Sequence, residues 1–301
     1  MAPIDPVRRV RISAQGIHVE HKLPRKEFAS LWDAIHVDAG IKDRLLSQAL
    51  LNFTVRSKID RARVPMHGII LLAGKPGTGK TSLAKGLADR VAQMLPKARL
   101  AYLEVEPHSL QSSSLGKSQK AVTDLFAITI AERAAQGPTF VLLDEVETLI
   151  VDRSKLSMDA NPIDVHRATD AALVQLDHLA EAHPHLLFVA TSNFSAAIDS
   201  AFHSRCDLIV DIPLPETAAI RSIMEDTIHA FAHSYPKVKA LLDKPAFASA
   251  VSAAHGLDGR QIRKAVASAF TFEKKVALDP ELVSGEHLLQ AMQLAKKGHS
   301  R

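Results

Sequence analysis

The stretch LLAGKPGTGKTSLAKGLA, residues 71–88, places a glycine-rich loop between an apolar run and a helix-forming run. Its centre matches G-x-x-x-x-G-K-[ST], in which backbone N–H groups and a helix N-terminus surround phosphate oxygens. We expect Lys80 to contact the β- and γ-phosphates and the Thr81 hydroxyl to ligate Mg²⁺. The predicted nucleotide-binding residues are Gly74, Lys75, Pro76, Gly77, Thr78, Gly79, Lys80, Thr81 and Ser82. The loop alone fits a kinase, a switch, a DNA motor or a protein remodeller.

Two further apolar runs end in polar residues suited to phosphate chemistry. The run VLLDEVE delivers Asp144 and Glu145, and the run ending in ATSN delivers Asn193. Asp144 is expected to hold Mg²⁺, mostly through water, and Glu145 to polarise an attacking water. Asn193 is expected to hydrogen-bond that water or the γ-phosphate. A kinase needs only the first acid and a hydrolase benefits from both, so the pair favours ATP hydrolysis with ATP and Mg²⁺ as cofactors.

Two arginines follow these motifs. Arg205 lies in DSAFHSRCD and Arg260 in GLDGRQIRK. Each is either a positioned charge that stabilises phosphate oxygens or an ordinary solvated surface group.

The apolar pattern predicts an α/β fold. Short buried strands separated by helices are typical of a parallel sheet with both faces covered, and they are expected at 68–74, 99–105, 139–145, 185–193 and 208–215. After residue 215 the strand pattern stops, and four helices are expected at about 216–234, 237–254, 259–277 and 284–297. The predicted parts are an irregular basic arm (1–27, with a possible short strand at 7–12), an α/β ATPase domain (28–215) and a small helical lid (216–301).

Composition narrows the function classes. No apolar run approaches the roughly 20 residues of a membrane span, and the first residues lack the apolar region of a signal peptide. The single cysteine, Cys206, cannot form an internal disulfide, which fits a cytoplasmic location. The net charge is +4, but residues 1–27 and 295–301 each carry +3 and the remainder is net negative. This distribution argues against a DNA-acting protein such as a loader or transposition helper, the alternative that we keep.

In their order along the chain, these motifs resemble those of AAA+ ATPases: Walker A, Walker B, sensor 1, arginine finger and sensor 2. The resemblance is closest to the pachytene-checkpoint ATPases, which remodel HORMA-domain proteins, and it covers about residues 30–275. The segments that carry it are LWDAIHVDAGIKDRLL, LLDEVETL, ATSNFSAAIDSAFHSRCDL and GLDGRQIRKAV. The segments DSAFHSRCD and GLDGR are fairly specific to this branch, whereas the Walker motifs are not.

The resemblance implies a ring ATPase, usually a homo-hexamer, with ATP between subunits. Arg205 would reach the γ-phosphate of the neighbouring subunit, and Arg260 would couple nucleotide to the lid of its own subunit. The implied partner is a HORMA-domain protein and, through it, a cyclic-nucleotide synthase of an antiphage operon, which the ATPase switches off.

Two departures from the family pattern shape the expectation. The 27 residues of the arm are too few for the folded N-terminal domain of eukaryotic members, which favours a compact bacterial form. Ser114, Leu115 and Gly116 stand where relatives carry aromatic residues in the first pore loop, which suits brief local unfolding better than long threading. Residues 154–170 are a candidate second pore loop. A scaffold that hydrolyses little ATP is a further rival, and the Asp144–Glu145 pair argues against it.

Overall fold

The computed structural model describes residues 16–110, 117–152 and 162–299, which form two compact units. The first unit contains the described residues up to Trp32, with Gly40–Gly74 and Thr81–Asp211. The second contains Asp33–Ala39, Lys75–Lys80 and the described residues from Ile212 onward. The segment Lys75–Lys80 contains most of the phosphate loop, which was predicted to belong entirely to the large domain.

The first unit is built on a six-stranded sheet in the order β1-β3-β4-β5-β2-β6. The five strands from β2 to β6 are parallel, which confirms the predicted α/β class. Every residue of β2, β4 and β5 is buried, as expected for strands covered on both faces. The strands are β1 (Ile17–Lys22), β2 (Ile69–Ala73), β3 (Ala101–Val105), β4 (Thr139–Leu143), β5 (Leu186–Ser192) and β6 (Leu208–Asp211).

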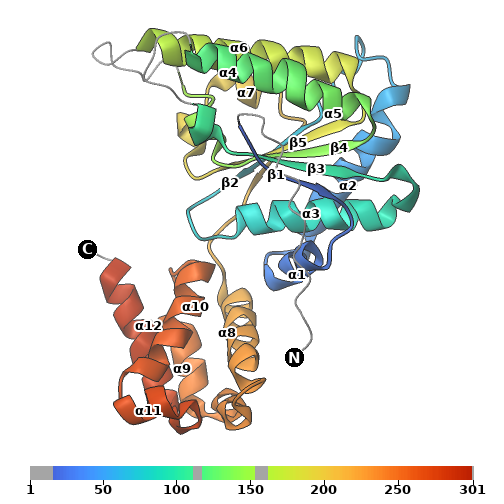
Figure 1. Cartoon of the computed structure of the whole chain (residues 1–301). Coiled ribbons are helices and arrows are strands. Elements are labelled where there is room, and N and C mark those ends of the chain that lie inside the picture. Colours follow the sequence, from blue (N-terminus) through green and yellow to red (C-terminus); the bar gives the residue numbers. More distant parts are fainter. Residues whose placement is uncertain (1–15, 111–116, 153–161, 300–301) are drawn as a thin grey trace, which may run out of the picture. The chain divides into compact units, whose positions relative to one another are not determined.

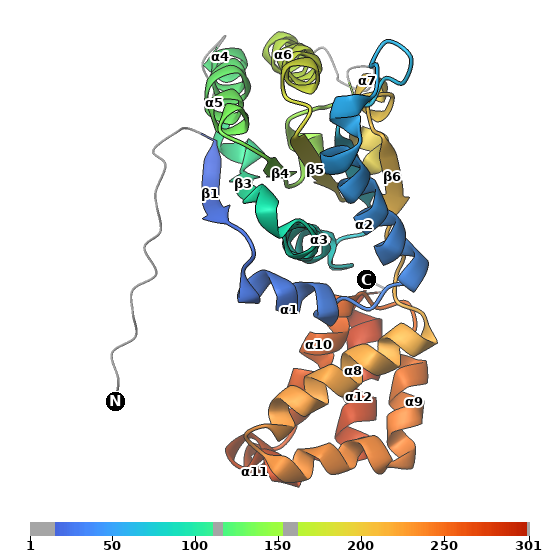
Figure 2. The same ribbon diagram turned by 90° about the vertical axis from the view of Figure 1, so that its right-hand side faces the viewer.

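Helices cover both faces of this sheet. In Figures 1 and 2, α4, α5 and α6 lie over one face and α3 lies over the other. Phe126, Leu173 and Leu176 are among the buried side chains that pack onto the first face. A π-helical stretch, Leu125–Ile130, joins α4 to α5. The helices are α1 (Lys26–Ala34), α2 (Ala39–Thr54), α3 (Lys80–Met94), α4 (Lys117–Asp124), α5 (Ala131–Ala135), α6 (Pro162–Ala182) and α7 (Ser200–His203).

The predicted irregular arm is wrong for the residues that lead into α1. Ile17–Lys22 forms the edge strand β1, which runs antiparallel to β3 and pairs Ile17 with Val105 and Lys22 with Ala101. The strand satisfies backbone N–H and C=O groups that β3 would otherwise leave open at the edge of the sheet. Its side chains are mostly half-buried or exposed, so it lacks the apolar pattern that identified the other strands. The strand expected at 7–12 lies outside the described residues.

The second unit is mainly helical beyond residue 216. Its buried core includes Met224, Phe247, Ile262, Val266 and Leu288. Ser284, directly before α12, caps that helix by accepting a hydrogen bond at Oγ from the His287 N–H at 3.3 Å. The α-helices are α8 (Thr217–Ala232), α9 (Pro245–Ala253), α10 (Gly259–Ser268), α11 (Lys274–Leu278) and α12 (Gly285–His299), with short 3₁₀ segments between several of them. No helix in either unit's described part has the length and apolar character of a membrane span.

Candidate functional site

The phosphate loop connects the end of β2 to the first turn of α3. Gly77 and Gly79 have φ angles of +80° and +89°, a backbone region that residues with a Cβ rarely adopt. A Cβ on Gly77 would also collide with the Asp258 carboxylate, and one on Gly79 would collide with Ile35. The glycines of the predicted motif are therefore required by backbone conformation and by close neighbours alike.

Lys80 lies at the first position of α3 and is 5% exposed. Its Nζ donates a hydrogen bond to the Lys75 carbonyl oxygen at 2.9 Å, and the Thr78 hydroxyl donates to the same oxygen at 2.9 Å. The ammonium group is thus held against the loop that was predicted to surround phosphates. This position suits the role predicted for Lys80.

The predicted metal ligands, Thr81 and Asp144, lie together in the first unit. The Thr81 hydroxyl donates a hydrogen bond to Asp144 Oδ1 at 2.8 Å. Asp144 directly follows β4, and Thr81 lies in the first turn of α3. A hydroxyl and a carboxylate that converge in this way supply the oxygen ligands that Mg²⁺ prefers. The residues present therefore fit a magnesium site.

Glu145 and Asn193 are also brought together. The Asn193 Nδ2 donates to Glu145 Oε1 at 3.1 Å, and the Asn193 backbone N–H donates to Glu147 Oε1 at 3.0 Å. Because β2, β4 and β5 are parallel, their carboxyl ends meet at one edge of the sheet. This edge gathers Thr81, Asp144, Glu145 and Asn193, as their sequence context predicted.

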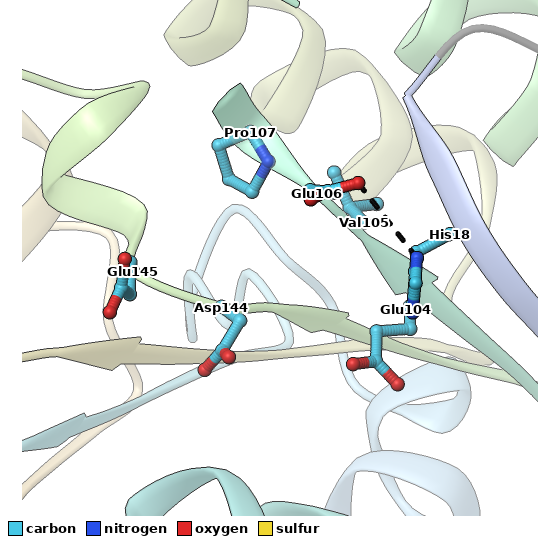
Figure 3. Close-up of a pocket in the computed structure, with 7 residues that line it drawn as sticks. All are labelled: His18, Glu104, Val105, Glu106, Pro107, Asp144 and Glu145. Carbon is cyan, nitrogen blue, oxygen red and sulfur yellow. Dashed lines mark ion pairs between the residues drawn. The ribbon is translucent and has the colours of Figure 1, made fainter. Parts of the chain in front are cut away.

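A cavity of about 280 Å³ opens beside the acid pair. In Figure 3, Asp144 and Glu145 lie on one side of it, while His18, Glu104 and Glu106 lie on the side of β1 and β3. Glu104 forms an ion pair with Lys85 at 2.9 Å and accepts a hydrogen bond from the Tyr102 hydroxyl at 3.0 Å. The carboxylates of Asp144 and Glu145 thus border an open space that water can enter.

Arg205 lies in a contact that the sequence did not predict. Its Nε and Nη2 donate to the two carboxylate oxygens of Asp177 on α6, at 2.8 and 2.6 Å, and its Nη1 donates to the Ala201 carbonyl at 2.7 Å. These hydrogen bonds lower the pKa of the Asp177 carboxyl. The guanidinium is thereby held in a fixed orientation next to α7, rather than as a mobile surface group.

Arg260 lies near the N-terminus of α10 in the second unit. Its backbone N–H donates to the Gly77 carbonyl at 3.3 Å, so the predicted lid motif contacts the phosphate loop within this unit. The turn before it is fixed by a capping box, in which Asp258 and Gln261 accept each other's backbone N–H groups. The GLDGR segment thus brings Asp258 as well as Arg260 beside the loop, and the sequence pattern indicated only the arginine.

The predicted pore-loop residues Ser114, Leu115 and Gly116 lie outside the described residues, as do residues 154–161 of the second candidate pore loop. The loop prediction is wrong for residues 162–170, which belong to α6. Three residues of the site were missed by the sequence analysis. Thr191 contacts the acid pair, Glu147 accepts a hydrogen bond from the Asn193 N–H, and Asp177 contacts Arg205. Thr191 lies within the quoted ATSN segment and Glu147 within VLLDEVE, so a signal was present for both. Asp177 lies in a helix without any motif.

Comparisons with known proteins agree with this geometry. A family model described as "ATPase family associated with various cellular activities (AAA)" matches residues 70–214. The chain is 56% identical over 283 residues to CD-NTase-associated protein 6 of Pseudomonas aeruginosa, covering 94% of this chain and 93% of that protein. It is 36% identical over 205 residues to a pachytene checkpoint protein 2 homolog of Danio rerio, covering 67% of this chain and 48% of that protein. The chain thus spans about half the length of this second relative.

Solved structures show the same fold. The structure of C. elegans PCH-2 matches with a TM-score of 0.73 and 26% identity, covering 94% of this chain and 76% of that one. A chain in the structure of the E. coli MS115-1 HORMA:CdnC:Trip13 complex matches with a TM-score of 0.71 and 19% identity, covering 93% and 95%. At 19% identity the second likeness concerns the fold alone.

Proposed function

Because the chain belongs to the AAA ATPase family, in the branch of the pachytene-checkpoint ATPases, we propose that it hydrolyses ATP to remodel HORMA-domain proteins. The observation that carries the hydrolytic part is the arrangement at the carboxyl edge of the sheet. Thr81 meets Asp144 at 2.8 Å and Asn193 meets Glu145 at 3.1 Å, beside an open cavity. A scaffold that binds ATP without hydrolysing it does not need the Asn193–Glu145 pair.

Each residue of this edge has a separate task in the proposed reaction. The Thr81 hydroxyl and the Asp144 carboxylate would hold Mg²⁺, and Lys80 of the adjoining phosphate loop would offer positive charge to the phosphates. When bound, Mg²⁺ neutralises negative charge that develops on the phosphate oxygens. Glu145 accepts a hydrogen bond from the attacking water and orients it, while Asn193 holds the Glu145 carboxylate in place. Proton transfer to a positioned carboxylate contributes typically about 10²- to 10⁴-fold to rate.

We assign Arg205 to the site of a neighbouring subunit in a homo-oligomeric ring, a hexamer in the usual family form. An arginine charge contributed by a neighbour stabilises phosphate oxygens in related reactions. The Asp177 pair holds the guanidinium ready in a defined orientation. In the same proposal, Arg260 joins the phosphate loop to the helical lid through the contact at Gly77.

The substrate part of the proposal is supported by the relatives. CD-NTase-associated protein 6 is named for association with a cyclic-nucleotide synthase, and the resemblance to the pachytene-checkpoint branch, shared by the Danio rerio relative, implies a HORMA-domain substrate. We therefore propose that this chain opens a HORMA-domain protein that activates such a synthase, and so switches off antiphage signalling in the bacterial cytoplasm.

A binding experiment separates this proposal from the DNA-acting alternative. The Glu145→Gln variant, immobilised with ATP and Mg²⁺, is expected to retain a HORMA-domain protein encoded beside this chain. The same protein should not be retained without nucleotide. Retention of DNA that falls steeply with salt, together with DNA-stimulated ATP hydrolysis and no HORMA retention, would support the alternative instead.

A further inference from the structure

Thr191 contacts both members of the acid pair through one hydroxyl group. The hydroxyl donates a hydrogen bond to Asp144 Oδ1 at 2.5 Å and accepts one from the Glu145 backbone N–H at 3.0 Å. Thr191 lies in β5, two residues before Asn193, and is 1% exposed. A single buried oxygen atom therefore connects the expected metal ligand to the expected water-orienting residue.

The sheet register explains why Thr191 reaches this place. Leu143 of β4 is paired with Ala190 of β5, so the next residues along the two parallel strands, Asp144 and Thr191, are neighbours. A strand this deeply buried would ordinarily take valine, which has the same shape as threonine. A buried hydroxyl is unfavourable unless its hydrogen bonds are made, and here it makes two. The hydroxyl is thus explained by its two partners rather than by packing.

The backbone at Glu145 adds a second reason for a fixed hydrogen bond. Glu145 has φ +52° and ψ +53°, the left-handed region that is unfavourable for a residue with a Cβ. This turn takes the chain out of β4 and brings the Glu145 side chain to Asn193. Its N–H donates to the Thr191 hydroxyl, and this hydrogen bond helps to hold the turn in that conformation.

Asp144 Oδ1 receives two hydroxyl donors, from Thr81 and from Thr191. Thr81 is also the predicted metal ligand, so its hydroxyl has a second task when Mg²⁺ is present. Thr191, which lies in β5, is the donor that holds the Asp144 carboxylate from within the sheet. Together the two contacts set the orientation of the Asp144 carboxylate, and the Thr191 hydroxyl also accepts the hydrogen bond from the Glu145 N–H.

We propose that Thr191 is a positioning residue for ATP hydrolysis, which holds Asp144 and the Glu145 turn in register through its hydroxyl. The inference rests on the proposed ATPase activity of this edge. Misplacement of catalytic groups by about 1 Å can lower a rate by about 10²-fold. The proposal therefore predicts that loss of the hydroxyl lowers kcat and raises the Mg²⁺ concentration needed for activity. The affinity for nucleotide in the absence of Mg²⁺ should change little.

Thr191→Val tests the hydroxyl because valine keeps the shape of the side chain. We expect kcat for ATP to fall about 10- to 100-fold, with a higher Mg²⁺ concentration needed for half-maximal activity. Affinity for a fluorescent ATP analogue in EDTA should stay within about 3-fold, because the phosphate loop is intact. Thr191→Ser retains the hydroxyl and should restore kcat to within about 3-fold of wild type.

Thr139→Val is the matched control for a lost buried hydroxyl. Thr139 is fully buried at the opposite end of β4, where its hydroxyl donates to the Gly137 carbonyl at 2.9 Å. We expect this variant to lose stability, as we expect of Thr191→Val, but to keep its kcat. Hydrogen exchange of the ligand-free protein supplies a readout without turnover: the Glu145 amide should exchange faster in Thr191→Val and remain protected in Thr191→Ser and Thr139→Val.

The outcomes separate this inference from the proposed function. Wild-type kcat and a protected Glu145 amide in a folded Thr191→Val protein would overturn the inference and leave the ATPase intact. An equal loss of kcat in Thr191→Ser and Thr191→Val would also overturn it, because the hydroxyl would then have no part. Absence of Mg²⁺-dependent ATP hydrolysis in the wild type would overturn the proposed function, and the positioning role with it.

Discussion

Replacing Glu145 with glutamine should reduce ATP turnover by about 10²-fold or more while ATP binding survives. Glutamine has the size of glutamate, and its carbonyl oxygen can still accept the hydrogen bond that Asn193 Nδ2 donates to Oε1. The change removes the negative charge that orients the attacking water and accepts its proton. The phosphate loop and the Thr81–Asp144 pair are left unchanged.

Steady-state phosphate release and equilibrium binding of a fluorescent ATP analogue measure the two effects. Glu132→Gln is the control, because Glu132 is an exposed residue of α5 and loses the same charge away from the acid pair. It should behave as wild type in both assays. Turnover by Glu145→Gln at the wild-type rate would show that Glu145 does not orient the water.

Replacing Arg205 with alanine should lower ATP hydrolysis by about 10³-fold or more and leave nucleotide affinity nearly unchanged, since arginines of this kind act on the transition state. The two hydrogen bonds to Asp177 orient the Arg205 guanidinium in the chain without nucleotide. Its orientation therefore does not require nucleotide to be bound. A loss of only a few-fold would indicate a structural role in the contact between α6 and α7.

Mixing experiments test whether Arg205 acts on a neighbouring subunit. When Arg205→Ala is mixed with Glu145→Gln, each of which should be nearly inactive alone, part of the activity should return, because a Glu145→Gln subunit can offer its Arg205 to the intact acid pair of an Arg205→Ala neighbour. The control is Arg205→Ala mixed with the Arg205→Ala/Glu145→Gln double variant, which should restore no activity because no subunit then supplies the arginine. Absence of any recovery in the first mixture, with exchange of subunits demonstrated, would refute a shared site.

The parts of the site that could be predicted are marked by patterns within short stretches of the sequence. The phosphate loop is a contiguous motif, and its Gly77 and Gly79 adopt the backbone conformations that the motif requires. Asp144, Glu145 and Asn193 each follow an apolar strand. Parallel strands bring their carboxyl ends to one edge, so strand order did not need to be known for these residues to be expected together.

The parts that were not predictable depend on contacts between distant segments. Thr191 acquires its role only from the register of β5 against β4, which pairs residues 47 positions apart. Asp177 lies 28 residues before Arg205 and has no feature that distinguishes it from other helix-surface acids. β1 was missed because an edge strand with few buried side chains needs no strong apolar alternation, and its partner β3 lies far along the chain.

The central claim is that ATP hydrolysis at the acid pair opens a HORMA-domain protein. The most direct measurement is the rate at which a closed HORMA-domain protein, encoded beside this chain, converts to its open, partner-free form. The account predicts conversion by the wild type with ATP and Mg²⁺, and none by Glu145→Gln. Conversion at equal rates by both proteins, or none by a wild type that hydrolyses ATP in its presence, would contradict it.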